Sequence, residues 1–221
     1  MDKISAVIVA AGEGKRFGAP KHLVLLSGKA ILEWTLQAFQ THPKITEIVL
    51  VLNNSAEGRE YQTHLSKITR VVHGGAQRQD SVAAGIRALN SQPPEIVLVH
   101  DGVRPLLSQD LIGRVIRQAQ ESGAAAPVIP VEDTLKHIDQ DQVIETPDRS
   151  RFFRCQTPQG FRFDLLERAL KEAAEDGFYG TDEAMLMERL GLPVAAIPGE
   201  VQNLKITTPL DLKIAEVLLD N

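Results

Sequence analysis

Short apolar runs rich in β-branched residues alternate along the chain with longer segments in which apolar residues recur at helical spacing. The runs at 4–10, 48–52, 71–72 and 96–99 predict buried strands. Between the first two runs, one face of a predicted helix is formed by Ile31, Leu32, Thr35, Leu36 and Phe39. Because strands and helices alternate regularly, we expect an α/β fold with a mainly parallel, twisted sheet flanked by helices.

The second half of the chain adds an arm and a terminal helix to this picture. The segment 131–157 breaks the rhythm with two apolar stretches around a polar turn, and this order predicts a projecting β-arm. Thr208 and Pro209 are typical of a helix start, and we expect that helix to run to Leu219. With 221 residues and no linker rich in Pro and Ser, the sequence predicts a single domain, 1–221, with the arm as an insertion.

A glycine-rich, basic loop follows the first predicted strand. It begins with Ala10, Ala11 and Gly12 and carries the cations Arg16 and Lys21. Glycines let backbone N–H groups face an anion, and the cations supply charge to polyphosphate oxygens. The loop therefore predicts a phosphate site, and a solvated turn with incidental basic residues is its alternative.

Two further loops, 74–81 and 101–105, also follow predicted strands. Ligands bind beyond the carboxyl ends of strands in open α/β sheets, so we expect these loops to share one pocket with the glycine-rich loop. Gly75 and Ser81 lie where a nucleotide can meet backbone donors at a helix N-terminus, although a turn and a helix cap would also explain them. Asp101 is a candidate ligand for Mg²⁺ or another divalent cation, and its alternative role is an ion pair with the nearby arginine.

Three other features of the late chain have simple structural interpretations beside the functional ones. Lys205 interrupts an apolar pattern, and it predicts either an anionic partner such as a bound phosphate or an exposed strand-edge position. Thr181-Asp182-Glu183 indicates a helix cap. Cys155 lacks the setting of a nucleophile, and we expect it to be a packed structural thiol.

Spacing, charge and length exclude several classes of protein. No glycine is followed by the Gly-Lys-Ser/Thr of a Walker loop, and Phe17 stands where a dinucleotide fingerprint requires glycine. The net charge of −5 argues against a nucleic-acid partner. No run approaches the length of a membrane span, and the N-terminus is too short for a signal sequence, so we expect a cytoplasmic protein without a membrane partner.

An ordered set of motifs runs along nearly the whole chain: Ala10-Ala11-Gly12, Arg16, Pro20-Lys21, His100-Asp101-Gly102-Val103-Arg104-Pro105, Asp133-Thr134, Thr157-Pro158-Gln159 and Asn203-Leu204-Lys205-Ile206-Thr207. Each motif is shared with other nucleotidyltransferases, but the set resembles the 2-C-methyl-D-erythritol 4-phosphate cytidylyltransferase family. The resemblance implies a Rossmann-like nucleotidyltransferase fold with a dimerising β-arm, and Mg²⁺ as cofactor. It also implies transfer of CMP from CTP to a polyol phosphate, 2-C-methyl-D-erythritol 4-phosphate, with release of pyrophosphate, in non-mevalonate isoprenoid synthesis.

The resemblance further implies roles for individual residues. The residues implied to bind the nucleotide are Ala10, Ala11, Gly12, Gly75, Ser81 and Asp101, of which Asp101 is the metal-side carboxylate. Those implied to bind the phosphorylated polyol are Arg104, Thr134, Arg149, Thr157 and Lys205. The implied catalytic cations are Arg16, Lys21, Arg149 and Lys205. Thr134 and Arg149 lie on the arm, and we expect them to serve the pocket of a neighbouring subunit.

Two alternatives remain open at this point. The nearer is ribitol-5-phosphate cytidylyltransferase, which shares the glycine-rich loop, the segment 101–105 and the late lysine. The other is a nucleotide-binding module that has lost the reaction. A homodimer is expected through the arm, because a lone hairpin cannot bury the apolar side chains of Leu135, Ile138, Val143 and Ile144.

Overall fold

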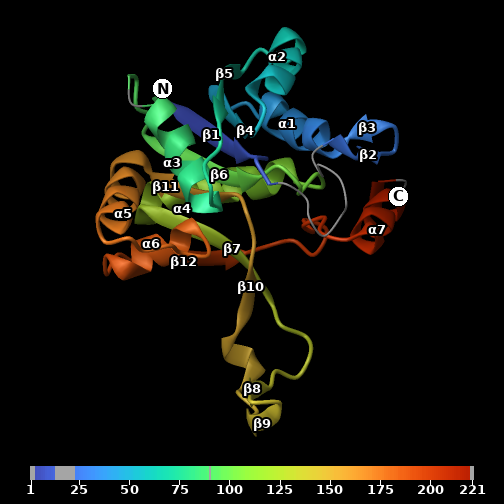
Figure 1. The fold of residues 1–221 in the computed structure, drawn as a ribbon, viewed down its shortest axis with the longest axis vertical. Helices are drawn as coiled ribbons and strands as arrows, with labels where there is room; N and C mark the ends of the chain where they lie inside the picture. The colour runs from blue at the N-terminus through green and yellow to red at the C-terminus, as the bar shows by residue number, and fades with distance from the viewer. Residues whose placement is uncertain (1–2, 13–22, 90, 220–221) are drawn as a thin grey trace.

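The structure, a computed structural model, describes residues 3–12, 23–89 and 91–219 of the chain (Figure 1). The two predicted cations of the glycine-rich loop, Arg16 and Lys21, lie outside the described residues.

An eight-stranded sheet forms the centre of the molecule (Figure 1). Its strands are β1 (Ile4–Val9), β4 (Glu47–Leu52), β5 (Ile68–His73), β6 (Ile96–Asp101), β7 (Ala124–Pro130), β10 (Phe153–Cys155), β11 (Gln159–Arg162) and β12 (Ala195–Pro198). They follow the order β10-β7-β11-β6-β1-β4-β5, and β12 pairs with β7. β1 runs parallel to β4 and β6, whereas β11 is antiparallel to β6 and β7. The predicted fold class is confirmed, and the four predicted strands all lie in this sheet.

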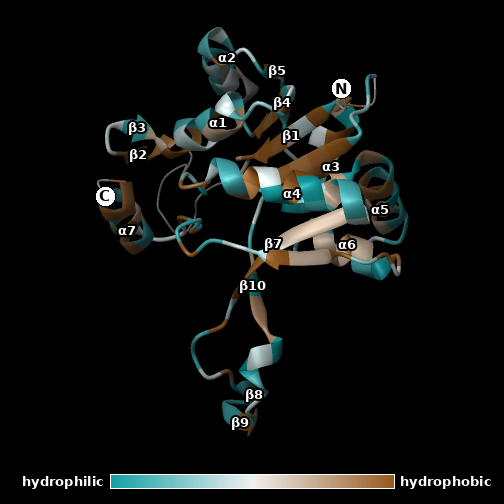
Figure 2. Ribbon diagram, turned by 180° about the vertical axis from the view of Figure 1, so that it is seen from behind, coloured by the Kyte–Doolittle hydropathy of each residue, from teal (hydrophilic) through white to brown (hydrophobic). Residues whose placement is uncertain are grey.

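Helices cover both faces of the sheet (Figures 1 and 2). α1 (Ile31–Thr41), α2 (Ser55–His64) and α4 (Gln109–Ser122) contribute to the apolar cluster on one face. α3 (Arg78–Leu89), α5 (Phe163–Glu175) and α6 (Glu183–Arg189) contribute to the cluster on the other. The buried residues of α1 are the five of the predicted apolar face.

Alternation along the central strands divides the core between the two faces. In β1, Ile4, Ala6 and Ile8 belong to the first cluster and Val7 to the second. β4 and β6 show the same alternation, with Ile and Leu toward the first cluster and Val toward the second. A strand that is buried on both faces reads as a continuous apolar run, which is why these strands could be located from the sequence.

The predicted arm leaves the sheet after β7 and projects away from it (Figure 1). Its tip is an antiparallel hairpin of β8 (His137–Asp139) and β9 (Gln142–Glu145). Gln140 and Asp141 have φ of 45° and 63°, as a two-residue hairpin turn requires. A short 3₁₀ helix, Arg149–Arg151, precedes the return of the chain to β7 as strand β10.

The terminal helix α7 (Pro209–Leu219) packs near a small hairpin of β2 (Leu25–Leu26) and β3 (Lys29–Ala30). Their shared apolar cluster is centred on Leu26, Ile31, Ile206 and Ala215. Thr208 caps the helix, because its hydroxyl accepts a hydrogen bond from the Asp211 N–H at 3.3 Å. In the part of the chain that the structure describes, no helix is long and apolar enough to cross a membrane.

Candidate active site

The carboxyl ends of the central strands meet at one rim of the sheet. The Ala10 N–H donates to Val51 O at 2.8 Å, and the Gly102 N–H donates to Val9 O at 2.9 Å. The Gly74 N–H donates to Leu52 O, also at 2.9 Å. Each loop therefore starts as a continuation of the strand pairing, and the described parts of the three predicted loops lie together.

Two glycines let these loops approach one another closely. A Cβ atom on Gly74 would overlap the Ala11 methyl group and lie 2.9 Å from Ser81 Oγ. A Cβ atom on Gly102 would lie 2.9 Å from the Ala10 methyl group. Such contacts are too short for real side chains, so a larger residue at either position would separate the loops.

The predicted nucleotide-binding groups of the second loop contact each other. The Gly75 N–H donates to Ser81 Oγ at 3.1 Å, and the Ser81 hydroxyl donates to Gln77 O at 3.2 Å. Ser81 is buried, whereas Gly75 and Gly12 are exposed at the rim. Ser81 thus stabilises the turn that places Gly75 at the rim.

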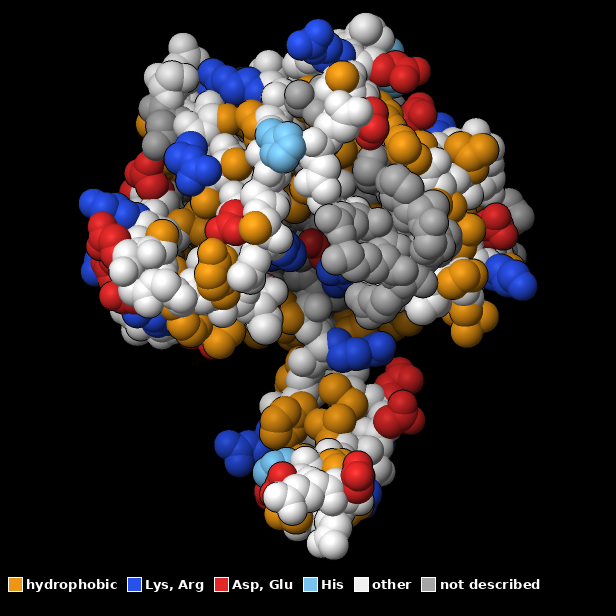
Figure 3. All heavy atoms as spheres, viewed as in Figure 1, with side chains coloured by type: hydrophobic (Ala, Val, Ile, Leu, Met, Phe, Trp, Pro, Cys, Tyr) orange, Lys and Arg blue, Asp and Glu red, His pale blue; other side chains and the backbone are white. Residues whose placement is uncertain are grey.

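Asp101, at the end of β6, collects three cations. Its Oδ1 lies 3.0 Å from Arg78 Nε, and its Oδ2 lies 2.9 Å from Lys205 Nζ and 3.7 Å from Arg104 Nε. Burial alone would raise the pKa of the Asp101 carboxyl, but the charges of Arg78, Lys205 and Arg104 outweigh it and hold the pKa well below its usual range. The carboxylate is therefore charged at neutral pH, and it fixes a group of cations at the rim. Figure 3 shows positive and negative side chains together in a hollow above the arm.

Arg78 and Glu183 belong to this cluster, and the sequence did not indicate either one as a functional residue. Glu183 is 1% exposed and holds the Arg78 guanidinium through two parallel contacts, of 2.7 Å to Nη1 and 3.0 Å to Nη2. The predicted helix cap is Asp182, whose Oδ1 accepts from the Met185 N–H at 3.0 Å. Arg78 could have been proposed from its place in the first turn after a strand-end loop. Glu183 carries no such signal, because its partner lies 105 positions earlier in the chain.

A buried hydrogen-bond network holds the backbone of Asp101 and the side chain of Arg104 in place. The Thr157 hydroxyl accepts from the Asp101 N–H at 3.1 Å and lies 3.0 Å from His100 Nδ1. Burial lowers the pKa of His100 to about 3, so the ring is neutral, and Nδ1 then accepts from Thr157 while Nε2 donates to Arg104 O at 3.3 Å. Asn203 accepts from Arg104 Nη1 at its backbone carbonyl and donates its amide to Thr157 O, both at 2.8 Å. The structure therefore brings Asp101, Arg104 and Thr157 together, with Lys205 at their edge.

Thr134 and Arg149 lie on the arm and are exposed. The Arg149 guanidinium donates to the backbone carbonyl of Glu132, which is also on the arm. Within the described ranges, no hydrogen bond or ion pair joins either residue to the Asp101 cluster. Within one chain they therefore lie apart from Arg104, Thr157 and Lys205, and their expected place in the pocket of a neighbouring subunit stays a prediction.

The expectation of a packed Cys155 is wrong. The residue is exposed, because β10 is an edge strand at the base of the arm. Partial burial of its thiol and the nearby Asp182 carboxylate raise the thiol pKa to about 11. A thiol that is protonated at neutral pH is a poor nucleophile, which agrees with its predicted lack of a covalent role.

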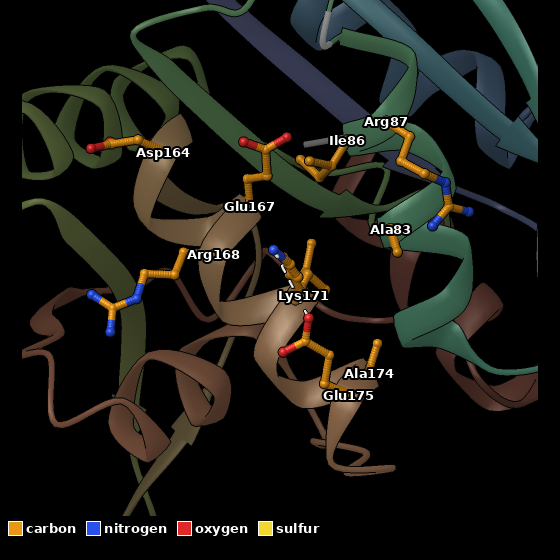
Figure 4. Close-up of a pocket in the computed structure, with 10 residues that line it drawn as sticks. Ala83, Ile86, Arg87, Asp164, Glu167, Arg168, Lys171, Ala174 and Glu175 are labelled. Carbon is orange, nitrogen blue, oxygen red and sulfur yellow. Dashed lines mark ion pairs between the residues drawn. The ribbon is translucent and has the colours of Figure 1, made fainter.

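A groove of about 730 Å³ lies elsewhere, between α3 and α5 (Figure 4). Its apolar floor includes Ile86 and Leu170, and its charged lining mixes both signs: Arg87, Asp164, Glu167, Arg168, Lys171 and Glu175. None of the predicted site residues lines it. Alternating charges of this kind are typical of solvated helix surfaces, so the strand-end rim is the better candidate for a site that binds polyphosphate.

The chain matches the family described as 2-C-methyl-D-erythritol 4-phosphate cytidylyltransferase over residues 4–221. It belongs to this family. A relative of that name from Symbiobacterium thermophilum is 44% identical over 98% of this chain and 93% of its own length. One from Syntrophus aciditrophicus is 42% identical over 98% of this chain and 96% of its own.

Solved structures of the family share the fold. The crystal structure of 2-C-methyl-D-erythritol 4-phosphate cytidylyltransferase from Thermus thermophilus has a TM-score of 0.83 and 38% identity, with full coverage of both chains. The 4-diphosphocytidyl-2C-methyl-D-erythritol synthase from Anaerococcus prevotii has a TM-score of 0.88 and 33% identity, over 100% of this chain and 97% of the other. The resemblance drawn from the ordered motifs is confirmed.

Proposed function

We propose that this chain transfers the cytidylyl group of CTP to 2-C-methyl-D-erythritol 4-phosphate and releases pyrophosphate, as the name of its family describes. The observation that carries the proposal is the group of cations that Asp101 holds at the carboxyl ends of the strands. Both substrates are phosphate esters, and a fixed set of positive groups at this edge of an α/β sheet suits them.

The reaction requires positioning and charge rather than a strong base. A phosphate oxygen of the polyol phosphate forms a bond to the α-phosphorus of CTP, while the bond from that phosphorus to the pyrophosphate oxygen breaks. The attacking phosphate is already an anion near neutral pH, so no side chain has to remove a proton from it. Charge accumulates on the α-phosphate oxygens in the transition state, and fixed cationic donors stabilise it there.

The polyol phosphate is assigned to Lys205, Arg104 and Thr157. Lys205 Nζ reaches the rim on a side chain that is 40% exposed, so it can contact a ligand without leaving Asp101. Arg104 Nε is buried and has no hydrogen-bond partner among the residues that the structure describes, because Asp101 Oδ2 lies beyond hydrogen-bond distance at 3.7 Å. A phosphate beside these two cations would satisfy a donor that the protein leaves unmatched.

The nucleotide is assigned to the backbone of Ala10, Ala11 and Gly12 and to the turn held by Gly75 and Ser81. Gly12 is exposed, and no atom of the described residues lies within 4 Å of the place that a Cβ atom would occupy, so these residues leave room for an anion there. Family membership supports Arg16 and Lys21 as the cations at the α-phosphate.

Mg²⁺ is proposed as the cofactor, with Asp101 as its protein ligand. Among the described residues there is no group of three or more His, Cys, Asp or Glu placed to bind a metal, so the triphosphate and water would have to complete the coordination. Asp101 fits as a single ligand, because each of its oxygens has a second lone pair beside the one that faces Lys205 or Arg78. The bound ion would offset negative charge on the triphosphate.

We also propose a homodimer formed through the arm. Ile138, Val143 and Ile144 are 54–59% exposed at its tip, and Phe152 and Phe153 are about half exposed at its base. A second copy that covers these side chains would also bring its Thr134 and Arg149 to the partner's pocket. Sedimentation should show a dimer for the wild type and a monomer of reduced activity for Ile144→Asp. A fully active monomeric variant would contradict the role of the arm.

A pyrophosphate-release assay tests the function directly. The enzyme is mixed with CTP, Mg²⁺ and either 2-C-methyl-D-erythritol 4-phosphate or ribitol 5-phosphate, and we expect turnover with the first. Turnover of ribitol 5-phosphate alone would refute the substrate assignment. Lys21→Ala should lose most of kcat and retain CTP binding, whereas a wild type that binds CTP without turnover would be a nucleotide-binding module.

A further inference from the structure

Glu183 is a buried carboxylate that the motifs of the family resemblance do not include. It lies at the start of α6 and is fully buried against the side of the sheet that carries α3 and α5. A buried carboxylate is costly unless it is paired, and both of its oxygens bind Arg78, at 2.7 and 3.0 Å. Two parallel contacts of this kind fix the plane of the guanidinium as well as its position.

The same guanidinium uses its remaining nitrogen on Asp101. Arg78 Nε lies 3.0 Å from Asp101 Oδ1. Asp101 Oδ2 is thereby left to Lys205, at 2.9 Å, and to Arg104, at 3.7 Å. The plane of the Asp101 carboxylate, and with it the place of Lys205 at the rim, depends on where Glu183 holds Arg78.

We propose that Glu183 and Arg78 are positioning residues, which hold Asp101 so that Lys205 and Arg104 are aimed at the substrate phosphate. The proposal rests on the proposed function of this rim. Neither residue needs to touch a substrate. They set the positions of the cations that contact the substrate, and a small displacement of those cations lowers the rate of the chemical step.

Positioning and simple electrostatics predict opposite results for Glu183→Gln. The substitution removes a negative charge near the rim, which by electrostatics alone would strengthen the binding of two anionic substrates. If Glu183 acts through the geometry of Arg78, kcat falls instead, because the neutral amide loses the paired contact that fixes the guanidinium.

Glu47 offers a matched control on the same sheet. It is 5% exposed and its carboxylate lies 2.8 Å from both Arg70 Nη1 and Lys3 Nζ. It stands at the first residue of β4, at the opposite end of that strand from the rim. Glu47→Gln therefore removes the charge of another buried, paired carboxylate at a distance from the cluster at Asp101.

The experiment compares urea unfolding and steady-state kinetics of Glu183→Gln, Glu47→Gln and the wild type, with CTP, Mg²⁺ and 2-C-methyl-D-erythritol 4-phosphate. Both variants should unfold at lower urea concentration than the wild type. We expect kcat of Glu183→Gln to fall by on the order of tenfold or more without a matching rise in either KM. The control should keep the wild-type kcat.

Arg78→Lys provides a second variant if Glu183→Gln does not fold. It keeps the positive charge but loses the two parallel contacts of the guanidinium with Glu183. The Arg78 side chain is 28% exposed, so this substitution disturbs a less buried position than Glu183. It should reproduce the loss of kcat, and the double variant should lose little more than either single variant. A folded Glu183→Gln or Arg78→Lys enzyme with wild-type kcat would overturn the proposal, as would losses that multiply in the double variant. A wild type without turnover would instead refute the proposed function.

Discussion

Asp101→Asn tests whether one carboxylate organises the rim. The substitution keeps the size of the side chain and removes the charge shared by Arg78, Lys205 and Arg104. Breaking a fully buried ion pair costs about 3–5 kcal/mol. We expect a loss of about 2–3 kcal/mol here, because the Lys205 side chain is 40% exposed and can return to water while Arg78 keeps Glu183.

Urea unfolding at pH 7, followed by circular dichroism, measures this loss. The control is Asp164→Asn, because Asp164 forms an ion pair with Arg162 at 2.8 Å in which both side chains are more than half exposed. An exposed pair contributes only about 0–1 kcal/mol.

The Asp101→Asn variant should also be a poor enzyme. Lys205 and Arg104 lose their shared anchor, and we expect kcat/KM to fall on the order of 100-fold, or about 3 kcal/mol of transition-state stabilisation. An Asp101→Asn enzyme as stable as the Asp164→Asn control and as active as the wild type would show that Asp101 does not organise the rim.

Three further predictions concern the rim and its supports. Lys205→Ala should lower kcat/KM for the polyol phosphate by on the order of tenfold or more in the pyrophosphate assay, whereas exposed Lys213→Ala on α7 should not; equal effects would argue against a phosphate contact. Gly74→Ala should cost about 1–3 kcal/mol of unfolding free energy through its clash with the neighbouring loop. Gly113→Ala, within α4, should stabilise the protein, because the added Cβ would lie 3.8 Å from its nearest described neighbour, His42 Nε2; a tolerated Gly74→Ala would contradict the close approach. Burial raises the pKa of the Glu47 carboxyl, but hydrogen bonds from its partners lower it below 4.5. The stability that the charged carboxylate contributes is therefore complete above that pH and is lost as the pH falls. In urea titrations, the stability difference between Glu47→Gln and the wild type should shrink from pH 7 to pH 3.

Periodicity located part of the central fold, because the four predicted strands and α1 each carry a signal of their own, whereas β7 and β12 were not predicted. The five apolar positions predicted for α1 are its buried face, and the runs at β1, β4 and β6 are buried on both sides. The antiparallel β11 was not predicted. Its four residues, Gln159–Arg162, insert between β6 and β7, and their burial comes from neighbours that are distant in the sequence.

Some residues of the site could be predicted from their local sequence, whereas others depend on contacts between residues far apart in the chain. Asp101 and Gly75 follow strand ends, where the general rule for open sheets predicts a pocket. Glu183 contacts a residue 105 positions earlier in the chain, which no local pattern indicates. Asn203 belongs to one of the motifs of the resemblance, but its contact with Arg104, 99 positions earlier, could not be predicted from it. Lys205 was left between two interpretations, and the structure supports a part of each: its side chain is exposed, although it lies in no strand, and it has an anionic partner in Asp101.

A crystal structure of the wild-type enzyme with CTP and Mg²⁺ would show whether the cations around Asp101 face the reacting phosphate. We expect the triphosphate over the loops that follow β1, β5 and β6, with its α-phosphate facing these cations. A triphosphate bound in the groove between α3 and α5, with the Asp101 cluster left in water, would contradict this expectation.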